Sequence, residues 1–249
     1  MIIDANANVG RSLYGPELAV EEVVRRMEAS GIDRAVVSSF TPPDLDFRRA
    51  NHAVAAAIAA DRRLIGFARI DPRLGEASLR ELETCRSEGL RGVKVDPFEQ
   101  AFQINSNLVF DFFKACGAAR MPVLVVAGYP VVSTPIQIGD LAERLPDLIL
   151  LIAHGGQLAM HGLGIFDCLN VVQSNANVYV ESSGIPETGT ESLIERAVLE
   201  TSAERVVFGT NMPINHPQME LERIRVAAIP ETARQQILGS NMAKILALR

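Results

Sequence analysis

Three acid–base side chains stand at or directly after short apolar segments of the sequence, namely His154, Asp96 and Glu181. An unperturbed histidine has a pKa of about 6.5, so it accepts and donates a proton near neutral pH. We therefore expect His154 to be the general acid–base residue, with Asp96 and Glu181 as an acid–base pair across the same site. The alternative for Asp96 and Glu181 is a salt bridge from either carboxylate to Lys94, and the alternative for His154 is a side chain that only hydrogen-bonds its own loop.

A second group of polar residues could bind a small molecule: Asn6, Asn8, Lys94, Asn211, Arg11 and Tyr129. Asparagine amides offer both donors and acceptors, an ammonium can neutralise a carboxylate, and a guanidinium can hold one with two parallel hydrogen bonds. The alternatives are a hydrogen-bonded set of vestigial asparagines, an internal ion pair for Lys94, a solvated loop position for Arg11 and a structural role for Tyr129.

The elements that must position these residues recur from end to end of the chain, because a short apolar run, a turn and a helical segment alternate. The predicted strands are Ile2–Ala5, Ala35–Phe40, Ile65–Ile70, Gly92–Val95, Pro122–Ala127, Leu148–Ala153, Val178–Glu181 and Arg205–Gly209. The predicted helices are Glu17–Ser30, Leu45–Arg62, Glu76–Ser87, Leu108–Arg120, Gln137–Arg144, Leu158–Val172, Glu191–Thr201, Pro217–Val226 and Glu231–Leu248.

The strands are nearly continuous apolar runs, which is typical of parallel strands covered by helices on both faces. Eight such units in 249 residues match an α/β fold, a single (β/α)8 TIM barrel that forms one domain over residues 1–249. A doubly wound open sheet is the alternative, but no Gly-x-Gly-x-x-Gly motif follows the first strand. In a TIM barrel the functional residues lie at the C-terminal ends of the strands, where the candidate residues stand.

The composition, with 48% hydrophobic residues and a formal net charge of -6, predicts a chain that buries a large core and carries no basic stripe for nucleic acid. The three cysteines are scattered along the chain, which indicates free thiols in a reducing compartment. No apolar run is long enough to cross a membrane, and the first residues do not resemble a signal peptide. We therefore expect a cytoplasmic protein with no nucleic-acid or membrane partner.

Five segments at the predicted strand ends carry a family resemblance: Ile3–Gly10, Gly92–Pro97, Pro122–Gly128, His154–Gly156 and Phe208–Pro213. In this order they resemble the Ile-Asp-x-His-x-His-x-Gly, Gly-x-Lys-x-His-Pro, Pro-Val-x-x-His-x-Gly, His-Gly-Gly and Phe-Gly-Ser/Thr-Asp-x-Pro motifs of the amidohydrolase superfamily. The chain is similar along its whole length to the branch that contains aminocarboxymuconate-semialdehyde decarboxylase. The resemblance implies a TIM barrel and metal-assisted chemistry on small acids.

The positions at which the resemblance places most of the metal ligands carry other residues here, namely Asn6, Asn8, Val126 and Asn211. Asp96 replaces the strand-4 histidine, and only His154 of the usual set remains. An amide is a weak, neutral ligand and a valine is none, whereas zinc takes three or four His, Cys or carboxylate donors. We therefore predict no metal ligands and no cofactor.

Three functions remain open at this point. The first is a metal-independent hydrolase of a small carboxylated or lactone substrate, since some branches of the superfamily are understood to hydrolyse lactones without metal. The second is a catalytically silent barrel, a pseudoenzyme that binds a ligand or supports an active paralogue. The third is a displaced metal site built from His154, Asp96 and Glu181, with Asn6 as an auxiliary donor. Tight loops would leave the barrel mouth open, so we expect a homo-oligomer or a hetero-oligomer with a paralogue.

Overall fold

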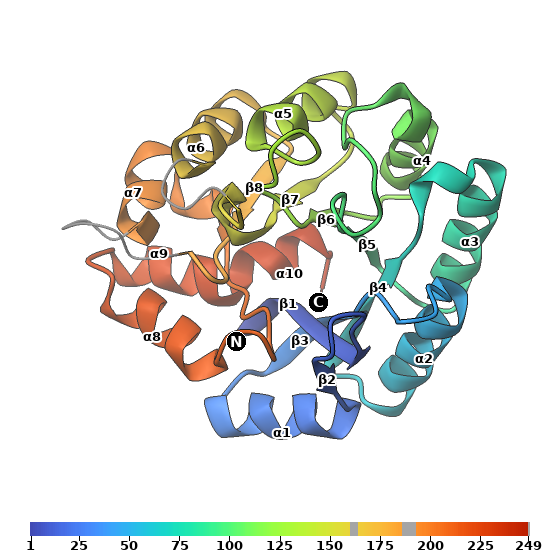
Figure 1. Ribbon diagram of the computed structural model, residues 1–249. Coiled ribbons are helices and arrows are strands. Elements are labelled where there is room, and N and C mark those ends of the chain that lie inside the picture. Colours follow the sequence, from blue (N-terminus) through green and yellow to red (C-terminus); the bar gives the residue numbers. More distant parts are fainter. Residues whose placement is uncertain (160–163, 186–192, 249) are drawn as a thin grey trace.

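The computed structural model describes residues 1–159, 164–185 and 193–248, which fold into a parallel barrel (Figure 1). The strands lie in the order β2-β1-β3-β4-β5-β6-β7-β8-β9, and β2 alone is antiparallel to its neighbour. Their bounds are β1 Ile3–Arg11, β2 Glu17–Leu18, β3 Arg34–Ser39, β4 Leu64–Arg69, β5 Gly92–Val95, β6 Val123–Val125, β7 Leu150–Ile152, β8 Val178–Glu181 and β9 Val206–Val207. The amide of Ala5 donates to the carbonyl of Phe208 at 2.9 Å, and Ala7 forms a parallel bridge with Met212. These contacts join the first strand to the last, so the predicted (β/α)8 barrel is confirmed.

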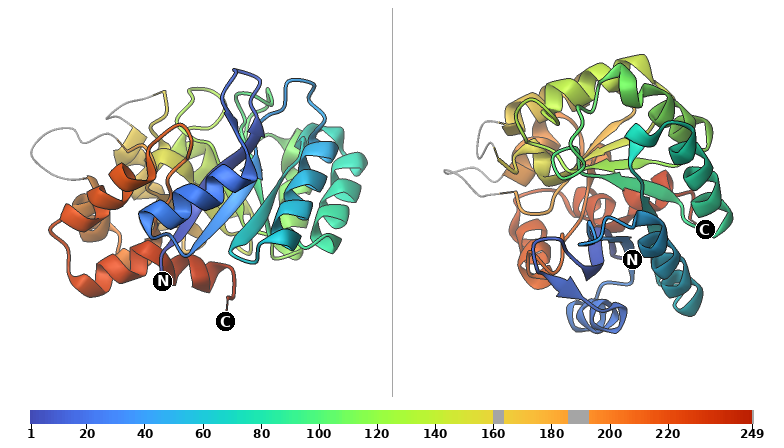
Figure 2. Two further views of the ribbon diagram at one scale, coloured as in Figure 1. Left: turned by 90° about the horizontal axis from the view of Figure 1, so that it is seen from below. Right: turned by 45° about the vertical axis from the view of Figure 1, so that its right-hand side comes forward.

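Helices form a shell around the strands, and both chain ends lie at the same end of the barrel (Figure 2). The α-helices are α1 Val20–Ser30, α2 Phe47–Ala60, α3 Glu76–Ser87, α4 Asn107–Ala118, α5 Pro135–Arg144, α6 Gly164–Ser174, α7 Leu193–Glu200, α8 Pro217–Val226, α9 Glu231–Gln235 and α10 Asn241–Ile245. Short 3-10 turns cover η1 Pro72–Leu74, η2 Ala153–Gly156 and η3 Ala203–Arg205, and η4 Gln236–Ser240 is a π-helix. Within the described ranges, no helix has both the length and the apolar character needed to cross a membrane.

Local sequence signals explain where several helices begin. Thr134 and Gln137 form a reciprocal capping box at the start of α5, and Pro135 occupies the first turn, where its missing amide hydrogen costs nothing. The hydroxyl of Ser106 caps α4 by accepting from the amide of Leu108. These side chains satisfy amide groups that a helix start leaves unpaired, so each helix begins at a defined residue.

The first strand is longer than predicted, because β1 runs on to Arg11 and pairs with β2 as a short hairpin. Asn6 and Asn8 therefore lie inside a strand and not in the loop after it. The predicted helix Glu17–Ser30 is shorter for the same reason and begins at Val20. The predicted C-terminal helix Glu231–Leu248 is divided by a π-helix, and residues 160–163 and 191–192 of two predicted helices lie outside the described residues.

The barrel interior has its own apolar core, separate from the layer between strands and helices. Phe67 is a fully buried member of this core, and Met242 and Leu246 contribute to it from the C-terminal end of the chain. A Cβ atom at Gly92 would lie only 2.4 Å from the Phe67 ring, so the neighbouring strand must carry a glycine there. Because this apolar core fills the end of the barrel where the strands begin, polar side chains are expected at the opposite end, where the strands finish.

Candidate functional site

A buried lysine is the centre of the polar network at the carboxyl ends of the strands. Lys94 lies on β5, and its Nζ donates to Oδ1 of Asn6 and to Oδ1 of Asn8, at 2.7 Å in both cases. Because side chains alternate across a strand, Asn6 and Asn8 leave β1 on the same face and converge on one point inside the barrel. The structure thus brings together three of the predicted binding residues.

Further hydrogen bonds fix which way each amide points. Nδ2 of Asn6 donates to Oε2 of Glu181 at 3.1 Å and to Oγ of Ser183 at 3.3 Å. Nδ2 of Asn8 donates to Oδ1 of Asn211 and to the carbonyl of Met212, both at 3.0 Å. Since these nitrogens face acceptors, both amide oxygens must face the lysine.

Lys94 is only 2% exposed, and both of its hydrogen bonds go to neutral oxygens. Burial lowers the pKa of Lys94 to about 7, and the positive charge of Arg69 adds to the effect. A lysine near this pKa exists as both ammonium and amine at neutral pH. The group can therefore carry a positive charge or give up a proton under ordinary conditions.

Glu181, at the end of β8, is fully buried and satisfied by its neighbours. Its two carboxylate oxygens accept from the amide of Ser183 at 2.7 Å and from the hydroxyl of Ser183 at 2.8 Å. Burial raises the pKa of Glu181. A Cβ atom at Gly209 would come within 1.9 Å of Oε1, so a glycine at this point makes room for the carboxylate. Glu181 thus holds Asn6 and Ser183 in place.

His154 follows β7 in a left-handed backbone conformation, with φ 59°. Its Nδ1 lies 3.0 Å from the carbonyl oxygen of Ser183. A carbonyl only accepts, so Nδ1 carries the ring hydrogen and Nε2 keeps a lone pair. Burial, with a smaller contribution from the nearby charge of Lys94, lowers the pKa of His154 to about 4. The imidazole is therefore a neutral base at physiological pH.

Asp96 belongs to a neighbouring cluster and not to the Glu181 network. Its Oδ1 accepts from the amides of Phe98 and Glu99, both at 3.1 Å. Burial raises the pKa of Asp96 to about 6, and the Glu99 carboxylate contributes in the same direction. Arg69 is 3% exposed and lies 3.6 Å from Glu99. None of these hydrogen bonds joins Asp96 to Glu181, the two residues of the predicted acid–base pair.

Two predicted binding residues lie at the rim. Arg11 is exposed at the end of β1, next to the hairpin partner Glu17. Tyr129 is half-buried, and its ring stacks on Phe98 with 4.4 Å between the ring centroids. Both side chains border the mouth, while the Lys94 network lies below them.

Several contributors to the site carried no recognised signal in the sequence. Ser183 links Glu181 to His154, and Asp4 accepts from the amide and hydroxyl of Thr210 at 2.8 Å and 2.6 Å. The Ser38 hydroxyl is buried without a hydrogen-bond partner among the described residues, on the β3 position that pairs with Asn8. The charge of Arg69 inside the apolar run Ile65–Ile70 is the signal that could have identified that residue.

The side chains present do not fit a bound divalent metal at the position that the family resemblance indicates. The amide oxygens of Asn6 and Asn8 already receive the Lys94 Nζ, and Val126 offers no donor atom. The part of the chain that the structure describes contains no group of three or more His, Cys, Asp or Glu placed to hold a metal. A dication beside the Lys94 ammonium would also be repelled.

Comparison with known proteins places this barrel in a family. The amidohydrolase family model matches residues 10–248. A gamma-resorcylate decarboxylase from Polaromonas sp. strain JS666 is 23% identical over 284 residues, covering 90% of this chain and 86% of the relative.

Solved structures of decarboxylases share the fold. The dihydroxybenzoic acid decarboxylase from Polaromonas sp. JS666, with bound manganese and 2-nitroresorcinol, has a TM-score of 0.78 at 18% identity and covers 99% and 97% of the two chains. The 2,6-dihydroxybenzoate decarboxylase from Rhizobium has a TM-score of 0.76 at 17% identity and covers 99% and 98%. The match of the family model to nearly the whole sequence, on a barrel of the same architecture, shows that the chain belongs to the amidohydrolase family.

Proposed function

We propose that this barrel is a metal-independent hydrolase of a small carboxylate or lactone, which binds beside the Lys94 ammonium. The supporting observation is the pair of 2.7 Å hydrogen bonds from Lys94 Nζ to the Asn6 and Asn8 oxygens. An ammonium has three N–H donors, and two are used here, so one remains for an anionic oxygen. A protein cation thus lies between the two β1 side chains whose family counterparts hold metal.

The neutral imidazole of His154 supplies the base. Its Nε2 removes a proton from water, and the water oxygen forms a bond to the lactone carbonyl carbon. The carbonyl oxygen becomes negative and is stabilised by the free N–H of Lys94. The ring C–O bond then breaks, and the leaving oxygen takes the proton back from His154, which yields a hydroxy acid.

Glu181 and Asp96 have supporting roles in this scheme. Glu181 acts through Ser183, which contacts both the carboxylate and His154 Nδ1, and so holds the imidazole in one orientation. Asp96, whose pKa is raised to about 6 by burial, can exchange a proton at the edge of the site. Arg11 and Tyr129 at the rim would contact the outer part of the substrate.

A second candidate is a silent barrel, and near-complete burial of the network favours it. Lys94, His154 and Glu181 are 2%, 3% and 0% exposed, as expected for a hydrogen-bonded plug. Such a protein would bind its ligand at the rim or support an active paralogue without turnover.

The first experiment combines metal analysis with a substrate screen. The metal content of the purified protein is measured after dialysis against metal-free buffer. Lactones and hydroxybenzoates are then tested with and without chelator, the hydroxybenzoates because the relatives are named as decarboxylases. We expect well under one metal ion per chain and lactone hydrolysis that survives chelator. Lys94→Met should lower kcat/KM by about 100-fold, because it removes the group that stabilises the oxyanion.

The control is Lys114→Met, which removes an exposed lysine on α4 and should leave kcat/KM within about twofold. Stoichiometric metal together with chelator-sensitive activity would overturn metal independence. Absence of turnover on every substrate, with binding that survives Lys94→Met, would favour the silent barrel.

A further inference from the structure

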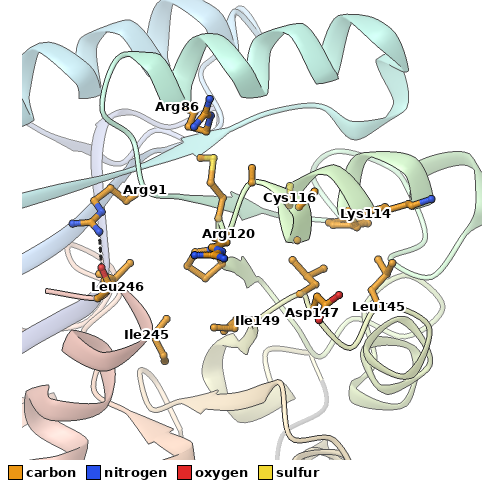
Figure 3. Close-up of a pocket in the computed structure, with 18 of the residues that line it drawn as sticks. Arg86, Arg91, Lys114, Cys116, Arg120, Leu145, Asp147, Ile149, Ile245 and Leu246 are labelled. Atoms are coloured by element: carbon orange, nitrogen blue, oxygen red, sulfur yellow. Dashed lines mark hydrogen bonds between the residues drawn. The ribbon is translucent and has the colours of Figure 1, made fainter.

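A cavity of about 1240 Å³ lies at the end of the barrel opposite the Lys94 network (Figure 3). Its walls are the loops from α3 to β5, from α4 to β6 and from α5 to β7, together with the end of α10. Each of these loops enters a strand at its amino end, so the cavity and the candidate site are separated by the barrel's own apolar core. We call it the basal cavity.

The surface of the basal cavity combines an apolar wall with positive charge. Met121, Pro122, Ile149 and Ile245 supply apolar side chains. Among the lining residues, five are cationic (Arg86, Arg91, Lys114, Arg120 and Arg144) and Asp147 is the only carboxylate. In a chain whose formal net charge is -6, this is a local reversal of sign.

Two of these cations already have carboxylate partners. Arg86 pairs with Glu83 at 2.7 Å, and Arg144 pairs with Asp140 at 3.6 Å. Lys114 extends away from the cavity in Figure 3. These three groups therefore do not supply the charge that faces the cavity.

Arg91 and Arg120 border the basal cavity from two different loops (Figure 3). Arg91 donates through Nη2 to the carbonyl of Leu246 at 2.6 Å, which anchors its side chain without neutralising it. Arg120 has a φ of 54°, a left-handed conformation that favours glycine after a helix, yet a long cationic side chain occupies the position. No ion pair of either arginine occurs among the described residues.

We infer that the basal cavity binds a small organic anion, whose carboxylate, sulfonate or phosphate group contacts Arg91 and Arg120 and whose apolar body packs against Met121, Pro122 and Ile149. Guanidinium groups suit planar and tetrahedral anions because they present donors in a fixed fork. The volume exceeds that of ordinary small-molecule pockets, so a ring-sized body fits. Metal cations and nucleic acid are poor occupants, since the lining repels the first and the chain's net charge repels the second.

A matched pair of fluorescent probes tests the inference. 1-Anilinonaphthalene-8-sulfonate has an apolar body and one sulfonate, and N-phenyl-1-naphthylamine has the same body without the charge. We expect saturable binding of the sulfonate at one site per folded chain and about tenfold weaker binding of the neutral probe. Arg120→Glu should weaken binding of the sulfonate at least tenfold and leave the neutral probe unchanged.

Arg62→Glu is the control, because Arg62 is exposed and does not line the basal cavity. It makes the same charge change and should leave sulfonate binding unaltered. Circular dichroism verifies that both variants are folded. Equal affinity for the two probes, or unchanged sulfonate binding in Arg120→Glu, would overturn the inference. Lys94→Met, tested alongside, distinguishes probe bound at the mouth from probe in the basal cavity.

Discussion

The charged side chains of the Lys94 network are buried, and each one forms hydrogen bonds with particular neighbouring residues. Lys94 is held by two amide oxygens, and Glu181 is held by the amide and hydroxyl of Ser183. An aspartate at position 211, as in the family motif, would add a half-buried charge beside Asn8, whereas the neutral Asn211 accepts from Asn8 without one. Neutral amides at Asn6, Asn8 and Asn211 are therefore consistent with a site whose cation is a lysine.

Glu220 on α8 gives a pH-dependent prediction at the same scale. It is 4% exposed, accepts from the amide of Gly184 at 3.2 Å, and burial raises its pKa to about 7. Between pH 4.5 and 7 the unfolded chain releases this proton while the folded chain keeps it, so stability is lost as the pH rises through 7. We therefore compare the free energy of unfolding of Glu220→Gln with that of the parent, measured in urea at pH 5 and at pH 8. The difference should shift in favour of the variant by on the order of 2 kcal/mol from pH 5 to pH 8.

Glu222→Gln on the same helix is the matched control. Glu222 is an exposed residue 3.9 Å from Arg225, and the difference in stability from the parent should stay within about 0.5 kcal/mol at both pH values. A difference for Glu220→Gln that does not change with pH would contradict the assigned role of burial.

At the scale of elements, the strands position the side chains of the site, and the sequence predicted the strands well. The continuous apolar runs identified the eight parallel strands, because burial on both faces leaves that pattern. The sequence placed Lys94 and Glu181 near the ends of two of these strands, and the structure has them there. The partnership of Lys94 with Asn6 and Asn8 could not be predicted, since the pairs are separated by 88 and 86 residues and depend on barrel geometry.

The link between Ser183 and His154 was hidden for a different reason. It depends on the left-handed backbone of His154, which the two following glycines permit but do not dictate. The hairpin of β1 with β2 was also missed, because a strand of two residues has too little pattern to read. Short-range signals therefore predicted the barrel, while the network at its mouth required the fold itself.

Packing at two glycines, one in a strand and one in a helix, yields a pair of opposite predictions. Gly92→Ala places a Cβ 2.4 Å from the Phe67 ring, and it should destabilise the protein by about 1–3 kcal/mol through overpacking. Gly117→Ala in helix α4 meets Leu148 at an ordinary 3.5 Å, and it should stabilise the protein by about 0.5–1 kcal/mol through better helix propensity. Urea unfolding of both variants measures the two signs. A Gly92→Ala variant as stable as the parent would contradict this account of β4–β5 packing, and a destabilised Gly117→Ala would contradict the account of the space beside α4.

At the scale of the whole molecule, four of the loops around the mouth carry exposed apolar side chains. Each of the following is at least 42% exposed: Leu13, Tyr14, Phe98, Val131 and Ile214. They lie in loops that follow β1, β5, β6 and β9. An apolar rim of this kind is typical of a surface that another protein covers.

We expect this rim to hold two or more chains together in solution. Val131→Asp should shift the protein toward monomer in light scattering, because it places a charge in the contact. Leu199→Asp makes the same change on α7, away from the mouth, and should leave the molar mass unchanged. A monomeric parent protein at high micromolar concentration would refute the expectation.

The closure of the barrel through Asp4 and Thr210 also has a consequence for folding. These residues are 206 positions apart, and the contact forms only after nearly the whole chain is available. Bringing such distant segments together is slow, since the entropy of a long loop is lost before the contact rewards it. During synthesis β1 leaves the ribosome first but must wait for β9. The Lys94 network, which depends on β1 and β8 together, is therefore among the last parts of the molecule to assemble.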